Sequence, residues 1–193
     1  GVQNLPFSGA HTDLNSLPTI TGNVTLASNT QFSGFEVTGG VSSAAATAFI
    51  VDNSVINNAA GDALSITGAA TSTLTNLKLT SGAGRGLFLN DSAATVTDLH
   101  VVNAATNGVE VTTGATSRIV TINNLTVDAA GQHGVDLNLG GAGSMNYTES
   151  GTTNIKSTGN AFYAALQAGS TGFLNLTMGT VNLASTAGAG VNL

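Results

Sequence analysis

The chain has 193 residues and a formal net charge of −6, with ten acidic side chains, four basic side chains and no cysteine. Four basic residues cannot form the positive surface that binds nucleic acid, and a chain without cysteine has no disulfide or thiolate metal ligand. No apolar run approaches the roughly 18 residues of a membrane helix, so we expect no direct membrane insertion by this segment.

Charged residues make up 7% of the chain, against roughly 25% in an ordinary soluble domain. The polar residues are mainly Thr, Ser, Asn and Gly, which favour strands and turns over long helices. We expect residues 1–16 to form an N-terminal lead-in or cap, because they lack the basic start and apolar core of a signal peptide. Residues 17–193 should form one repetitive domain that continues beyond this fragment of a longer protein.

An Asn or Asp recurs ahead of alternating apolar residues, at Asn53, Asn76, Asp98, Asn124 and Asn154, and we call these residues the markers. The intervals between them are 23, 22, 26 and 30 residues. Self-similarity at a period of this length is typical of solenoids. Apolar residues alternate with variable ones after each marker and again after Gly86, Gly108 and Gly134, as in strands with one buried face. The chain is therefore predicted to be all-β, a right-handed parallel β-helix of about seven coils with 22–30 residues each.

The longer C-terminal intervals predict extra loop residues, with YTESG at 147–151 and AGSTG at 168–172 as the expected positions. The marker itself has a structural explanation, because amides stacked at one corner of successive coils can hydrogen-bond along a ladder. We expect this ladder to face inward and to include all five markers. The alternative for these side chains is contact with a ligand.

Two outward columns hold most of the chemically interesting side chains. The residues just before the repeated glycine are Asp62, Arg85, Asn107 and His133, and those two places after it are Ser65, Phe88, Glu110 and Asp136. Asp62 and Arg85 are expected to form a surface ion pair. The candidate binding residues are Phe88, Glu110, His133 and Asp136.

Stacking on adjacent coils would bring Glu110 and Asp136 to roughly 5 Å from each other, the carboxyl separation of retaining glycosidases. Any two acids in one solenoid column have that separation, so a solvated acidic face explains them as well. Phe88 could be an exposed platform for a sugar or a partner, or it could be covered by a neighbour. A lone surface histidine such as His133 is usually neither an acid nor a base in catalysis.

The segment LPTITGNVTLASNTQFSGFEVTGG, residues 17–40, resembles the opening of the β-helical passenger of inverse autotransporters, the intimin/invasin-like adhesins. The resemblance implies display on the outer membrane of a Gram-negative bacterium and a role in adhesion, aggregation or biofilm formation. The same fold occurs in pectate lyases, polygalacturonases and phage tailspikes. GQHGV at 131–135 and RIV at 118–120 are similar to two polygalacturonase motifs, but they occur in the reverse order, so no catalytic role is transferred.

We therefore expect a non-catalytic adhesion module with no cofactor and no metal. Its partner would be a glycan or protein of a host surface or extracellular matrix, or another copy of itself. The first alternative is a polysaccharide lyase or hydrolase that uses Glu110, Asp136 and His133. The second alternative is an ice-binding solenoid, suggested by the threonine pairs 19/21, 73/75 and 95/97, which later coils are not expected to continue.

Overall fold

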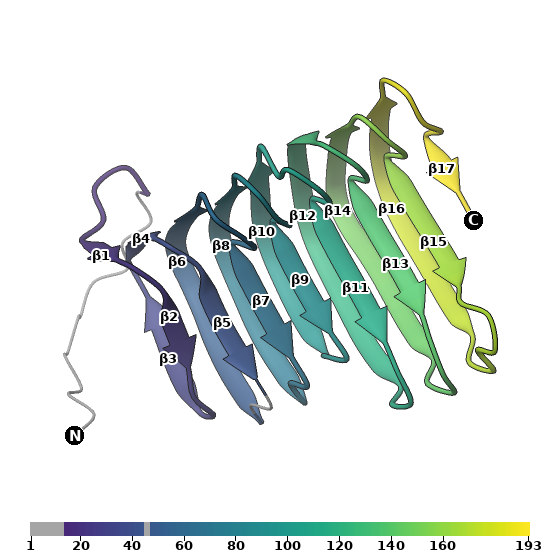
Figure 1. Ribbon diagram of the computed structural model, residues 1–193, viewed down its shortest axis with the longest axis horizontal. Coiled ribbons are helices and arrows are strands. Elements are labelled where there is room, and N and C mark those ends of the chain that lie inside the picture. Colours follow the sequence, from purple (N-terminus) through teal and green to yellow (C-terminus); the bar gives the residue numbers. More distant parts are fainter. Residues whose placement is uncertain (1–13, 45–46) are drawn as a thin grey trace.

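The computed structural model of the protein describes residues 14–44 and 47–193, so most of the expected lead-in at 1–16 lies outside the described residues. The described chain forms two parallel sheets, one of nine strands and one of eight (Figure 1). The first sheet contains β1 (Thr19–Thr21), β3 (Thr30–Ser33), β4 (Glu36–Thr38), β6 (Ala48–Asn58), β8 (Thr71–Ser81), β10 (Ala94–Val102), β12 (Arg118–Ala130), β14 (Met145–Ser157) and β16 (Leu174–Ser185). The second contains β2 (Val24–Leu26), β5 (Val41–Ala44), β7 (Leu64–Thr67), β9 (Leu87–Asn90), β11 (Val109–Thr113), β13 (Val135–Leu139), β15 (Phe162–Leu166) and β17 (Val191–Asn192).

The chain passes back and forth between the sheets, and each strand pairs in parallel with its equivalent in the next coil. This confirms the predicted right-handed parallel β-helix, with about six turns where about seven were expected. From β6 onward, each coil consists of one long strand in the first sheet and one short strand in the second. The two strands expected on either side of each marker are thus a single long strand.

The core lies between the two sheets because alternate residues of every strand point inward. In β8, Leu74, Leu77 and Leu79 are at most 2% exposed, and in β9 Leu87 and Leu89 are fully buried. Burying each such side chain is worth about 1.5–3 kcal/mol. The same inward positions in successive coils are apolar almost throughout, so the core is one continuous column of stacked side chains.

Each long strand bends at its marker. The backbone φ angles of Asn53, Asn76, Asp98 and Asn124 are 46°, 51°, 55° and 61°, in the left-handed region. Asn and Asp occupy this region at lower cost than other residues with a side chain, which explains why they recur at the bend.

The marker side chains point outward at the bend, and not inward as expected, with Asp98 and Asn124 exposed. Asn76 Nδ2 donates to Asn53 Oδ1 at 2.9 Å, and Asn124 Nδ2 donates to Asp98 Oδ1 at 2.8 Å. The markers thus form two hydrogen-bonded pairs on the surface of the solenoid. The bend places two outward residues in succession, which is why the markers interrupt the apolar alternation without entering the core.

Asn154 was wrongly included in this column. It pairs in register with Thr126, two places beyond Asn124, and its Oδ1 accepts a hydrogen bond from Asn182 Nδ2 at 2.9 Å. The cause is that Gly151, with φ 69°, takes the marker place at the bend of β14. A pattern of Asn and Asp alone passes over a glycine there, although glycine adopts the left-handed region at no steric cost. A β-bulge beside Gly151 adds one further residue to β14.

The two expected loops have different outcomes. Residues 147–151 lie within β14, and the extra length there is absorbed by the bulge. Residues 168–172 do lie outside the strands, between β15 and β16.

Candidate functional site

The candidate site lies on the outer face of the second sheet, where two side-chain columns run parallel to the solenoid axis. Strands β7, β9, β11 and β13 place Ser65, Phe88, Glu110 and Asp136 in register, and β15 adds Tyr163. The turns that precede these strands carry the other column, Asp62, Arg85, Asn107 and His133. Residues 22–27 apart in the sequence therefore become direct neighbours.

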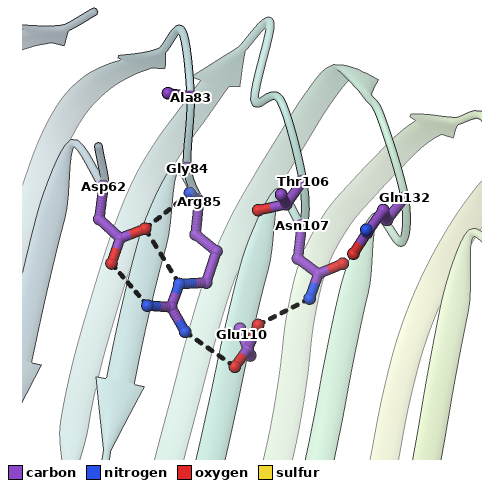
Figure 2. Close-up of a pocket in the computed structure, with 8 residues that line it drawn as sticks. All are labelled: Asp62, Ala83, Gly84, Arg85, Thr106, Asn107, Glu110 and Gln132. Atoms are coloured by element: carbon purple, nitrogen blue, oxygen red, sulfur yellow. Dashed lines mark hydrogen bonds and ion pairs between the residues drawn. The ribbon is translucent and has the colours of Figure 1, made fainter. Parts of the chain in front are cut away.

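Arg85 connects the two columns by binding acids on both adjacent coils (Figure 2). Its Nη2 lies 2.7 Å from Asp62 Oδ2, and its Nη1 lies 3.0 Å from Glu110 Oε1. The backbone N–H of Arg85 also donates to Asp62 Oδ1 at 2.8 Å. Burial raises the pKa of Asp62, but the hydrogen bonds and charge of Arg85 outweigh it, so the net shift is downward. The expected ion pair is thus part of a three-residue network.

Phe88 is half-buried, because the guanidinium of Arg85 lies over its ring at 3.4 Å from the centroid. This is a cation–π contact, and it covers the ring face that was considered as an exposed sugar platform. The flat group at the surface here is therefore the guanidinium of Arg85, a side chain that is 25% exposed.

One amide holds the two carboxylates of the central pair. Asn107 Nδ2 donates to Glu110 Oε2 at 2.7 Å and to Asp136 Oδ2 at 2.8 Å. Asn138 Nδ2 donates to the other oxygen, Asp136 Oδ1, at 2.8 Å. With Arg85 on Glu110 Oε1, every oxygen of both carboxylates accepts a hydrogen bond from within the protein.

The central carboxylates are close to each other and differ in burial. Because Glu110 Oε2 and Asp136 Oδ2 contact one nitrogen, they lie within about 5.5 Å, the range found in retaining glycosidases. Asp136 is 7% exposed. Burial and the negative charge of Glu110 raise the pKa of Asp136, against the opposing effects of His133, Asn138 and Asn107.

The His133 side chain is held by a hydrogen bond and by a stacked ring. Its Nδ1 accepts the backbone N–H of Asn160 at 3.1 Å, so the ring hydrogen lies on Nε2 in this arrangement. The ring stacks on Tyr163 with centroids 4.8 Å apart and an interplanar angle of 13°.

The position of His133 in its column explains the Nδ1 contact. Asp62, Asn107 and Asn160, at the equivalent turns, likewise accept a backbone N–H from the next coil. The histidine therefore serves as a turn acceptor, which explains its presence without catalysis.

Arg85, Asn107 and Glu110 border a surface cavity of about 330 Å³. Its walls are Asp62, Ala83, Gly84, Arg85, Thr106, Asn107, Glu110 and Gln132, shown in Figure 2. The other predicted binding residues, Phe88, His133 and Asp136, are not among these walls. Carboxylate, guanidinium, amide and hydroxyl groups thus border one hollow together with apolar surface. Ligand sites combine a concave shape with a few placed polar groups, so this hollow is the candidate binding site.

A column of threonines occupies the outer face of the first sheet. Register pairing aligns five of them on successive coils: Thr73, Thr95, Thr121, Thr148 and Thr177. The expectation that later coils do not continue the threonine rows was wrong for this row, because intervals of 26, 27 and 29 residues hide the alignment in the sequence. It was right for the row of Thr75 and Thr97, which Asn123 and Ser150 follow. The flanking columns are mixed, since Ile119 and Asn123 interrupt them. A second cavity of about 320 Å³ lies beside the row, next to the Arg118–Asp91 ion pair.

Two classes of feature are absent from the part of the chain that the structure describes. No group of three or more His, Asp or Glu side chains there could hold a metal ion. Among these residues there is also no helix with the length and apolar character needed to cross a membrane.

Sequence reasoning missed Asn138, Asn160 and Tyr163 as members of the site. Asn160 and Tyr163 precede and follow Ala161, which takes the place of the repeated glycine in this coil. Ala161 follows Gly151 by ten residues, as the repeated glycine follows the other markers. Placing the marker at Asn154 therefore shifted the expected column past Asn160 and Tyr163.

Comparison with known proteins agrees with the fold. A family model described as "Right handed beta helix region" matches residues 5–175. A search of curated proteins and a search of solved structures found no match. The comparison thus bears on how the chain winds, and it specifies neither a ligand nor an activity.

Proposed function

The chain belongs to the right-handed β-helix family, and from that premise we propose that it is a non-catalytic module that binds extracellular glycans. The binding surface is the cavity bordered by Arg85, Asn107, Glu110 and Gln132. The module acts in adhesion or aggregation on the surface of a Gram-negative bacterium. The resemblance of residues 17–40 to inverse autotransporter passengers supports this location.

The observation that carries the proposal is the full hydrogen bonding of Glu110 and Asp136. Each of their four oxygens accepts from Arg85, Asn107 or Asn138. A nucleophile or general acid needs a carboxyl group that is free to reach the reacting atoms. Oxygens with one hydrogen bond can still accept another from a sugar hydroxyl, so this arrangement favours binding of an unmodified ligand.

Charge also favours a neutral glycan. The cavity contains one guanidinium and two carboxylates, and the whole chain has a net charge of −6. Anionic polymers would be repelled by this surface. Hydrogen bonding to hydroxyl and N-acetyl groups is the chemistry that remains.

The test is binding of the purified chain to neutral and acidic polysaccharides by affinity gel electrophoresis, followed by calorimetry on the best ligand. Gln132→Ala removes an exposed cavity wall, and Gln167→Ala removes an exposed glutamine from the loop before β16 as a matched control. Losing one or two neutral hydrogen bonds should weaken binding about 3- to 30-fold in the first variant and leave the control unchanged.

The enzymatic alternative is tested with the same polymers. Glu110 and Asp136 have the spacing of a retaining glycosidase pair, and burial raises the pKa of Asp136 as in a general acid; both observations favour a hydrolase or lyase. Clear release of reducing ends by the wild type, lost in Glu110→Gln, would overturn the non-catalytic proposal. Binding without turnover supports it.

A second candidate function is ice binding, which the five aligned threonines of the first sheet favour. Hydroxyl and methyl groups repeat there at the strand spacing of about 4.8 Å on an uncharged row. Thermal hysteresis of the wild type, abolished by Thr121→Lys at the centre of the row, would establish it. Absence of hysteresis removes this candidate and leaves the glycan proposal unaffected.

A further inference from the structure

Glu149 occupies a position that is apolar in the neighbouring coils. Register pairing aligns it with Val96 and Ile122 on one side and Met178 on the other. Its side chain points into the core and is 2% exposed. An ionised carboxylate in such surroundings is strongly disfavoured unless it is paired.

The polar surroundings of Glu149 are incomplete. Tyr147, fully buried two residues earlier, donates its hydroxyl hydrogen to Glu149 Oε1 at 2.5 Å. The other oxygen, Oε2, is buried and has no hydrogen-bond partner. A single neutral donor compensates one oxygen and leaves the second without the solvation that a negative charge requires.

No positive charge faces this carboxyl in the described coils. The elements packed against it contribute Ile122 from β12 and Met178 from β16, and its own strand contributes Tyr147 and Thr153. Tyr147 is the titratable group beside it. Burial raises the pKa of Glu149, against the neighbouring hydroxyl groups of Tyr147 and Thr153, which lower it.

We propose that Glu149 is a neutral carboxylic acid in the folded protein and that its ionisation loosens β14 and β16. The bulge supplies a route for this change, because β14 has one residue more than β16 between Glu149 and Thr152. A strand with an extra residue can shift its register locally and turn an inward side chain outward. The coils that contact Glu149 thus form a pH-sensitive element, independent of the glycan site.

The sign of the effect comes from linkage. The folded state binds the Glu149 proton more tightly than the unfolded state, in which a glutamate titrates near pH 4.3. Above that pH the unfolding equilibrium constant rises by up to about tenfold per pH unit, until the pH exceeds the folded-state pKa. Between these two pKa values the protein therefore loses stability with rising pH relative to a variant that cannot ionise there.

The test compares wild type with Glu149→Gln, which keeps the shape, and Glu149→Met, which restores the apolar column. Asp98→Asn serves as a control at an exposed acid of the first sheet. Urea denaturation between pH 4.5 and 8.5 measures stability, and amide hydrogen exchange corrected for its intrinsic pH dependence reports on β14 and β16. The proposal predicts that wild type and the control lose stability and β14–β16 protection with rising pH relative to both Glu149 variants.

If Glu149→Gln does not fold, Glu149→Met decides the question by itself. Profiles of wild type and the variant that run parallel across this range would overturn the proposal, because the carboxyl would then titrate as an exposed one does. Infrared absorption of a protonated carboxyl at pH 7, present in wild type and lost in the variant, would be direct support, and its absence from wild type would contradict the neutral state.

Discussion

The left-handed bend at Asn76 allows the two roles of the marker to be measured separately. Asn76→Gly removes the hydrogen bond from Nδ2 to Asn53 Oδ1 but tolerates a φ of 51°. Asn76→Ala removes the same bond and places a β-carbon in the left-handed region. A part-exposed hydrogen bond is worth about 1 kcal/mol, and left-handed backbone costs a residue such as Ala about 1–2 kcal/mol.

The free energy of unfolding should therefore fall by about 1 kcal/mol in Asn76→Gly and about 2 kcal/mol in Asn76→Ala. Urea denaturation followed by circular dichroism measures both, with the midpoints compared at a common slope. Asn123 supplies the matched control, because it lies on the outer face of β12 without a positive φ. There the order should reverse, with Gly worse than Ala by about 0.5–1 kcal/mol.

The reasoning is refuted if alanine at position 76 is tolerated as well as glycine, or better. That result would mean that the bend does not select Asn and Asp for their backbone conformation. Equal losses for glycine and alanine at position 76 would point to the side-chain amide alone.

Three further predictions concern packing and charge. Gly134→Ala should destabilise the protein by about 1–3 kcal/mol, because a Cβ there would meet Ala161 O at 2.5 Å and the side chain of Ile155. Gly114 has open space around it, so Gly114→Ala should be nearly neutral in thermal melts. Leu89→Ala should cost about 2–5 kcal/mol by urea titration, since Leu89 is fully buried, and a smaller loss would mean that the second sheet does not cover the core. Arg85 lowers the pKa of Asp62, so this pair stabilises the fold above the unfolded-state pKa of Asp62, and the contribution is lost as pH falls through the folded-state pKa. Asp62→Asn should therefore flatten the acid side of the plot of melting temperature against pH, between about pH 2 and 5. An unchanged acid side would refute the pairing.

The repeat was readable from the sequence because the bend and the core each impose a residue type at a fixed place. Asn53, Asn76, Asp98 and Asn124 report the left-handed bend, and Leu or Val residues two apart report the inward face of a strand. Both constraints act within a few residues, so they survive changes in loop length between coils. Gly34, which lies one coil before Asn53, also has a left-handed φ, of 77°.

Two structural features were not readable. Whether the marker side chains point inward or outward depends on the bend in the strand. The alternation of apolar and polar residues does not indicate that bend. The marker place in β14 is filled by Gly151, so a pattern of Asn and Asp alone moves the marker three residues along the strand, to Asn154.

The sequence predicted which side chains of the site are neighbours, but not how they interact. The repeat spacing placed Glu110 beside Asp136 on the next coil, and the strand register confirms this. The hydrogen bonds of Asn107 to both carboxylates, and the Arg85 guanidinium over Phe88, depend on rotamers that spacing does not determine. These contacts decide whether the face presents free carboxyl groups, and hence which function is proposed.

Disulfide formation between engineered cysteines tests the stacking of coils most directly, because the natural chain has no cysteine. Thr73 and Thr95 pair in register, and Thr121 lies one coil further. Adjacent parallel strands are about 4.8 Å apart, within the Cα separation of about 4.4–6.8 Å that a disulfide bridges, whereas two coils span roughly twice the strand spacing. Oxidation should link the pair Thr73→Cys/Thr95→Cys and leave Thr73→Cys/Thr121→Cys reduced. Cross-linking of the second pair, or failure of the first in a folded protein, would contradict the winding on which the site and its proposed function depend.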